Sequence, residues 1–170
     1  EDGELYLEST KNESISYDDR RLRNASYNAS QGFGIRAIND EIIGYAHSPN
    51  INEKSIKEAG KTVELVINGS SASAKAPQKT TKKLYSSHDP MISIPFERKV
   101  EILKEIDDYA RSIDKRVIQV SANIGASMQE IVILRVDGTL TTDTRPMARI
   151  NVSVIVEQNG RRESGSSGAG

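Results

Sequence analysis

Two arginine-bearing segments near the end of the chain have the clearest capacity to bind a ligand. The first is Asp143-Thr144-Arg145-Pro146, and the second runs from Gly160 into a stretch of glycine and serine. Guanidinium groups donate paired hydrogen bonds, and successive backbone N–H groups can hold a carboxylate or a peptide carbonyl. The candidate contact residues are Arg145, Arg161, Arg162, Glu163, Ser164 and Gly165. A basic hairpin tip with a flexible end explains the same residues, and the residues alone favour that simpler interpretation.

The sequence offers no complete catalytic or metal site. It contains no cysteine and only two histidines, His47 and His88, which lie far apart. A zinc site would need several such side chains together. Glu105, Asp107 and Asp108 are neighbouring carboxylates in a predicted helix, and we interpret them as a solvated helix face. Neither a nucleophile elbow nor a Walker A loop occurs, so we expect no cofactor and no catalytic residue in this chain.

A glycine pattern at residues 32–37 matches the loose dinucleotide fingerprint G-x-G-x-x-[GA]. Binding a dinucleotide requires these glycines between a strand and a helix, so that the helix N-terminus faces the pyrophosphate. Here the glycines lie inside an alternating apolar and polar run, and another strand-like run follows. We therefore interpret them as positions of close backbone packing or a bulge.

Alternating polarity predicts strands in the first and last thirds of the chain. A tight turn is expected at Asn39-Asp40, and hairpin turns are expected at Asp137-Gly138, with type I′ geometry, and at Asn159-Gly160. The continuous apolar run at residues 131–134 predicts a strand covered on both faces. The predicted strands are residues 4–8, 14–17, 33–38, 42–47, 117–122, 130–136 and 150–157, with 161–163 returning along the sheet.

Helical periodicity appears twice in the middle of the chain. The first helix is expected to begin after the N-cap Asn52, to be stapled by Ile51 and Ile56, and to end at Asn68-Gly69. Its apolar stripe is Ile56, Ala59, Val63, Val66 and Ile67. The second helix follows Pro95, which suits a first-turn position. Its expected buried face is Phe96, Val100, Leu103, Ile106, Ala110 and Ile113.

The order strands–helix–helix–strands predicts an α+β fold: a mainly antiparallel sheet with two helices packed on one face. We expect one domain over residues 1–165, with an exposed loop at 69–90 in which the polar residues 69–83 are mobile. Residues 166–170 would be a glycine and serine tail. The stretch from Ser164 to Gly170 is not expected to form a packed element, being either a flexible linker or an interrupted glycine-rich loop.

Composition narrows the class of protein. The formal net charge is -1, so no strong basic field attracts nucleic acid or an anionic membrane. The absence of cysteine favours a reducing compartment, and we expect a cytoplasmic protein. No run approaches the roughly 18 apolar residues of a membrane span.

The chain resembles the N-terminal region of the TldD/PmbA family of bacterial metallopeptidases, and the residues that carry the resemblance occur in family order. Its closing stretch is more similar to the TldD-type subunit than to the PmbA-type (TldE) paralogue. The matching segments are Gly3–Tyr6, Ser26–Asn28, Gln31–Ile38, Gly44–Ala46, Lys115–Val117, Asp137–Leu140, Arg145-Pro146, Ile150–Val154 and Gly160–Gly165.

The resemblance implies a zinc-dependent peptidase that cleaves unfolded peptides together with a PmbA/TldE-type subunit. The family carries its zinc ligands on a His-Glu-x-x-x-His helix further along its sequence, and this chain has no such motif. We therefore expect a fragment truncated before the catalytic domain, whose role is to shape the substrate channel and the subunit interface. The alternatives are a non-enzymatic interaction module, such as a modulator of DNA gyrase, or an inactive remnant.

Overall fold

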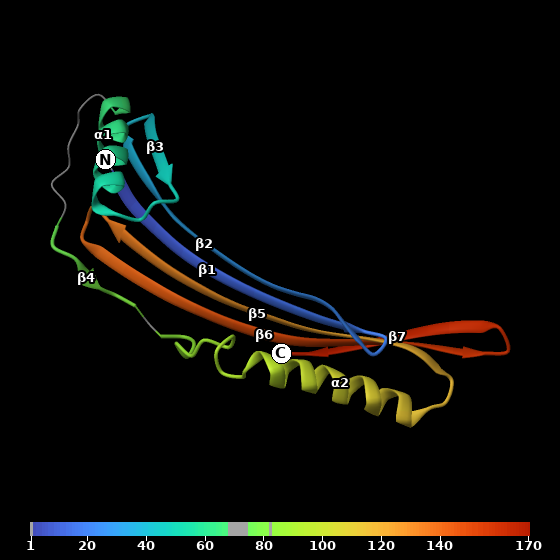
Figure 1. Cartoon of the computed structure of the whole chain (residues 1–170). Helices are drawn as coiled ribbons and strands as arrows, with labels where there is room; N and C mark the ends of the chain where they lie inside the picture. The colour runs from blue at the N-terminus through green and yellow to red at the C-terminus, as the bar shows by residue number, and fades with distance from the viewer. Residues whose placement is uncertain (1, 68–74, 82) are drawn as a thin grey trace. The chain divides into compact units, whose positions relative to one another are not determined.

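The computed structural model describes residues 2–67, 75–81 and 83–170, which form a mainly antiparallel sheet and two helices (Figure 1). The predicted α+β class is therefore confirmed. Among the described residues the strand order is β3-β2-β1-β5-β6-β4, and β7 also pairs with β6. The elements are β1 (Asp2–Asp18), β2 (Arg21–Asn39), β3 (Ile42–Ser48), α1 (Glu53–Val66), β4 (Gln78–Lys79), α2 (Phe96–Ile113), β5 (Val117–Arg135), β6 (Thr139–Gln158) and β7 (Arg161–Ala169).

The chain divides into two compact units. The first unit contains Glu1–Thr10, Ala29–Ser86 and Gln129–Arg145, and the second unit contains Lys11–Asn28, Ser87–Met128 and Pro146–Gly170. Strands β1, β2, β5 and β6 contribute residues to both units.

Helix α1 packs on β3 in the first unit (Figure 1). The contact is close at Gly44, where an added Cβ would lie 3.0 Å from the carbonyl oxygen of Val63. The predicted N-cap is confirmed, because the side chain of Asn52 accepts a hydrogen bond of 2.9 Å from the backbone N–H of Ser55. Ala59, Val63 and Ile67 are buried as predicted, whereas Val66 is exposed. The expected helix end at Asn68-Gly69 lies outside the described residues.

Helix α2 supplies the core of the second unit. Leu103 is completely buried in a cluster with Ile15 and Tyr17 of β1 and Ala122 and Ile124 of β5. The predicted ends of the buried face are wrong. Phe96 is 42% exposed and Ile113 is 67% exposed, because they are the first and last residues of the helix and the packed cluster is centred on Leu103.

Several strands are longer than alternation predicted. The two short runs near the N-terminus are one strand, β1, and the runs at 117–122 and 130–136 are joined in β5. Within β5, Ala122, Ile124, Ala126 and Met128 are buried at every second position. Small and polar residues disguise this alternation in the sequence. In the predicted loop, Gln78 and Lys79 form β4, which pairs in parallel with Thr139 and Leu140 of β6.

The backbone conformation of the hairpin turns agrees with the prediction in some turns and differs from it in others. Asn159 and Gly160 have φ of 52° and 77°, as a type I′ turn between β6 and β7 requires. In Asp137-Gly138 only the glycine has positive φ, at 87°, so type I′ geometry is wrong there. The turn between β1 and β2 was not predicted: Asp19 and Arg20 have φ of 46° and 65° although neither is glycine.

Candidate functional site

The predicted residues at Arg161–Gly165 lie on the β6–β7 hairpin of the second unit (Figure 1). The Nε of Arg162 donates a hydrogen bond of 2.6 Å to Glu157, its partner across the strands. The Nε of Arg161 donates a bond of 2.7 Å to Glu163, two residues away. Both arginines are exposed, so their ion pairs compete with water and leave the guanidinium groups accessible.

The glycine and serine stretch forms a strand and not a flexible tail. Ser164 pairs with Ile155, Gly165 pairs with Val154, and the ladder continues to Ala169 opposite Ile150. Every residue of β7 is exposed, and among the described strands β7 pairs with β6 alone. The other edge of β7 therefore presents backbone N–H and C=O groups that an extended peptide can pair with.

Arg145 belongs to the first unit, whereas Arg161–Gly165 belong to the second. Its Nε donates a hydrogen bond of 2.6 Å to Asp143 of the same strand, and this bond is the main reason that the pKa of Arg145 is raised. The positive charge of Arg145 also acts on Tyr6 and Glu8 of β1.

Tyr6 and Glu8 line an open groove of about 650 Å³ in the first unit, which sequence reasoning did not identify. Other walls come from Glu4 of β1, Arg36 of β2 and Tyr45 of β3. Because side chains alternate along a strand, Tyr45 faces away from α1, which packs on the neighbouring Gly44. In the sequence, Glu4, Tyr6 and Glu8 alternate with leucines, a pattern that predicts a strand but not a groove.

Glu8 is the best-defined charged group in this groove. Its carboxylate accepts hydrogen bonds of 2.8 Å from Gln129, 2.8 Å from Tyr6 and 2.9 Å from Thr10. These bonds, in that order, lower the pKa of Glu8, with a smaller contribution from Arg145. Burial, followed by the bond to Glu8, raises the pKa of Tyr6. The groove therefore holds an ionised carboxylate next to a neutral phenol at neutral pH.

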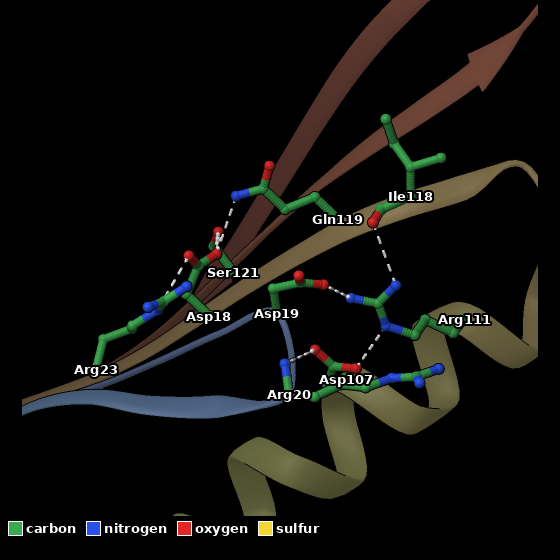
Figure 2. A network of polar contacts seen from close by, with 9 residues as sticks. All are labelled: Asp18, Asp19, Arg20, Arg23, Asp107, Arg111, Ile118, Gln119 and Ser121. Atoms are coloured by element: carbon green, nitrogen blue, oxygen red, sulfur yellow. Dashed lines mark hydrogen bonds and ion pairs between the residues drawn. The ribbon is translucent and has the colours of Figure 1, made fainter.

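A polar network in the second unit holds the turn between β1 and β2 (Figure 2). Asp107 of α2 accepts hydrogen bonds from the Nε of Arg111 at 2.7 Å and from the backbone N–H of Arg20 at 3.3 Å. Asp107 is only 1% exposed, so its interpretation as a solvated carboxylate is wrong. Figure 2 shows Arg111 reaching from Asp107 to Asp19, which binds the helix to the turn.

A second buried charge on α2 also escaped prediction. Lys99 is 3% exposed and pairs with Glu13 of β1. Its ammonium group also donates a hydrogen bond of 2.7 Å to the carbonyl oxygen of Met91. Because both contacts satisfy a buried ammonium group, we assign this pair a structural role.

The described residues do not supply the set of ligands that a metal ion needs. No group of three or more histidine, cysteine, aspartate or glutamate side chains with suitable geometry occurs among the described residues. His47 belongs to the first unit, where its ring lies 5.8 Å from that of Tyr45, and His88 belongs to the second. None of the described helices is long and apolar enough to cross a bilayer.

The mainly antiparallel sheet and the two helices define an α+β class of domain. Two family descriptions match the sequence: "PmbA/TldA metallopeptidase domain 1" over residues 3–69 and "PmbA/TldA metallopeptidase central domain" over residues 89–170. The chain belongs to the PmbA/TldD metallopeptidase family.

Curated relatives agree with this assignment. The chain is 36% identical to the "Metalloprotease TldD homolog" of Haemophilus influenzae, over 98% of this chain and 36% of the relative. It is 33% identical to the homologue of the same name from Buchnera aphidicola subsp. Acyrthosiphon pisum, over 99% of this chain and 35% of the relative. The chain thus spans about a third of the length of the curated relatives that it matches.

Solved structures share the fold at low sequence identity. A Thermotoga maritima protein described as a modulator of a DNA gyrase superposes with a TM-score of 0.77 and 14% identity, over 98% of this chain and 38% of that chain. TldE from Thermococcus kodakarensis superposes with a TM-score of 0.68 and 16% identity, over 99% of this chain and 40% of that chain.

Proposed function

We propose that this chain is the N-terminal, non-catalytic part of a TldD-type zinc metallopeptidase subunit. In this proposal a PmbA/TldE-type paralogue is the partner, unfolded peptides are the substrates, and the compartment is the cytoplasm. The observation that carries the proposal is the match of two successive metallopeptidase family domains, which together extend from residue 3 to residue 170. The zinc and its ligands would come from outside the described residues, because these residues offer no ligand set.

The open edge of β7 supports a role in substrate contact. An extended peptide could pair with its backbone groups irrespective of peptide sequence, since these hydrogen bonds use only main-chain atoms. The small side chains of Ser164–Gly168 would leave room for varied peptide side chains. The guanidinium groups of Arg161 and Arg162 would bind carbonyl or carboxylate groups of the same peptide, or of the partner subunit.

A domain exchange tests the proposal. Replacing the corresponding third of the Haemophilus influenzae TldD homologue with this chain should give a subunit that cleaves an unfolded peptide when its TldE-type paralogue is present. The control replaces the same third with an unrelated α+β domain of similar length. A chimera that folds and binds zinc but cleaves no peptide would contradict the proposed role.

The contribution of the hairpin is tested by one substitution within that chimera. Arg162→Ala should lower peptidase activity without lowering the melting temperature, because Arg162 is exposed and its one ion pair lies at the surface. Arg98→Ala on α2 is the control, since it also removes an exposed arginine, which pairs with Glu101 and Glu105. Equal activity of the two variants would rule out a substrate contact at Arg162.

A non-enzymatic role is the second candidate, favoured by the description of the Thermotoga maritima protein as a modulator of a DNA gyrase. With a net charge of -1, such a module would act through protein contacts and not by binding DNA directly. A pull-down with this chain distinguishes the two candidates. Recovery of a TldE-type subunit supports the peptidase role, and recovery of gyrase without that subunit supports modulation.

A further inference from the structure

The groove in the first unit contains two carboxylates, Glu4 and Glu8, and among the described residues only Glu4 has an arginine partner. Glu4 forms an ion pair of 3.0 Å with Arg36 of β2. Glu8 receives three hydrogen bonds, but all three donors are neutral: Gln129, Tyr6 and Thr10. No cationic side chain among the described residues lies within ion-pair distance of Glu8. The negative charge of Glu8 is therefore fixed in position but not neutralised, and it is complementary to the cationic group of a ligand.

Arg145 does not fill that role. It lies near enough to influence the charge of Glu8, but its Nε is bonded to Asp143 at 2.6 Å. Its influence is also the weakest of those that favour the ionised form of Glu8. The carboxylate of Glu8 therefore has no ion-pair partner among the described residues and can accept a guanidinium group.

The aromatic side chains determine which cation fits. Tyr45 is 61% exposed, its ring covers Gly34, and it stands beside the ring of His47. The phenol of Tyr6 is fixed by its bond to Glu8. A guanidinium group is planar and weakly hydrated, so it can stack on an exposed ring while it pairs with a carboxylate. An ammonium group is more strongly hydrated and cannot form the same planar contact.

We propose that this groove binds an arginine side chain of an extended polypeptide, with Glu8 as its counter-ion and Tyr45 as its stacking surface. The Arg36–Glu4 pair shows that the same groove already accommodates a guanidinium group next to a carboxylate. The inference deepens the proposed function and rests on it for the biological source of the arginine, which is a peptide substrate. The binding itself requires no catalytic centre.

Binding of short peptides to the 170-residue chain tests the inference directly. The probes are acetylated, amidated Ala-Ala-Arg-Ala-Ala and the same peptide with citrulline in place of arginine, which keeps the shape and removes the charge. Isothermal titration should give about ten-fold weaker binding for the citrulline peptide, as expected for loss of a charge-assisted hydrogen bond. Amide NMR shifts caused by the arginine peptide should centre on Glu8, Tyr45 and Arg36. A lysine peptide should bind more weakly than the arginine peptide.

Two variants locate the site. Glu8→Gln keeps the size of the side chain and should weaken arginine binding about ten-fold, to the level of the citrulline peptide. Tyr45→Leu should weaken it about three-fold and leave folding intact, because the ring is mostly exposed. Glu64→Gln is the control, since this exposed carboxylate belongs to α1, which covers the opposite face.

The outcomes that overturn the inference are specific. They are equal binding of the arginine and citrulline peptides, equal binding of the lysine and arginine peptides, or shifts centred outside the groove. Unchanged affinity of both Glu8→Gln and Tyr45→Leu would do the same. Because no peptidase activity is measured, a chimera that lacks activity would refute the proposed function while leaving this binding result to stand or fall on its own.

Discussion

The buried pair of Lys99 and Glu13 should be the most sensitive electrostatic contact in the second unit. Glu13→Gln removes the negative charge and leaves the ammonium group of Lys99, which is 3% exposed, without a charged partner among the described residues. Breaking a buried ion pair by removing one charge costs about 3–5 kcal/mol. For a chain of 170 residues, each kcal/mol lowers the melting temperature by about 2–4 °C. The expected decrease is therefore at least about 6 °C.

The reciprocal change should cost less. Lys99→Met replaces the buried ammonium group by an apolar side chain of similar length, and Glu13 can turn toward solvent because its side chain is 15% exposed. Combining the two changes removes both charges, so the double variant should be more stable than Glu13→Gln alone. Urea denaturation of the four proteins provides the double-mutant cycle.

Glu105→Gln on the same helix is the control for this cycle. Glu105 pairs with Arg98 at the surface, so its loss should leave the melting temperature nearly unchanged. If Glu13→Gln were as stable as Glu105→Gln, or if the double variant were the least stable of the four, the reasoning about buried charge would be refuted.

Four further substitutions test other features of the structure. Asp107→Asn should destabilise the chain by about 1–3 kcal/mol in urea denaturation, because Arg111 loses its buried counter-ion; unchanged stability would contradict this. Hydrogen bonds from Ser121 and Gln119 lower the pKa of Asp18 below its ordinary value of 3.8. The ionised carboxylate therefore stabilises the fold above that value, and this stabilisation is lost as the pH falls through the folded pKa. Asp18→Asn should therefore flatten the acid limb of the melting-temperature profile, and a limb of unchanged slope would argue against it. Gly44→Ala should destabilise the chain by about 1–3 kcal/mol, because its Cβ would meet the α1 backbone at 3.0 Å. Gly60→Ala should instead stabilise α1 by about 0.5–1 kcal/mol, because a Cβ there meets nothing within 4 Å. Opposite signs in urea denaturation are expected, and equal signs would contradict the packing argument.

The sequence was most informative where local chemistry determines the structure. The N-cap at Asn52 and the turn at Asn159-Gly160 depend on only a few adjacent residues, and both were predicted correctly. The middle of α2 was also predicted, because Leu103 and its neighbours follow the helical period. These features need no information about distant parts of the chain.

The features that were not predicted depend on contacts between residues far apart in the sequence. The burial of Asp107 depends on the backbone N–H of Arg20, 87 positions earlier, and that of Lys99 depends on Glu13, 86 positions earlier. The turn at Asp19 and Arg20 is likewise held by a helix remote in sequence. Residue type alone predicts such charges to be solvated, because the partner that makes burial possible is not visible locally.

The sequence identified Arg161 and Arg162 as candidate contact residues, but it did not predict the full length of the strand in which they lie. Arg161 and Arg162 do lie at a hairpin tip, as the simpler interpretation proposed, but the glycine and serine that follow are strand and not tail. Low β-propensity argued against a strand there, and the ladder along β6 overrides it. The groove around Glu8 was not recognised because its members come from three strands and share no motif.

The composition of β7 has a consequence for how its ladder is aligned. From Ser164 to Gly168 the side chains are a hydrogen atom or a hydroxymethyl group, so few lateral contacts distinguish one alignment with β6 from another. The two-residue turn at Asn159-Gly160 therefore determines the pairing register of the whole hairpin. Adding one residue there would move Arg162 away from Glu157 and reverse the face that each of its neighbours presents.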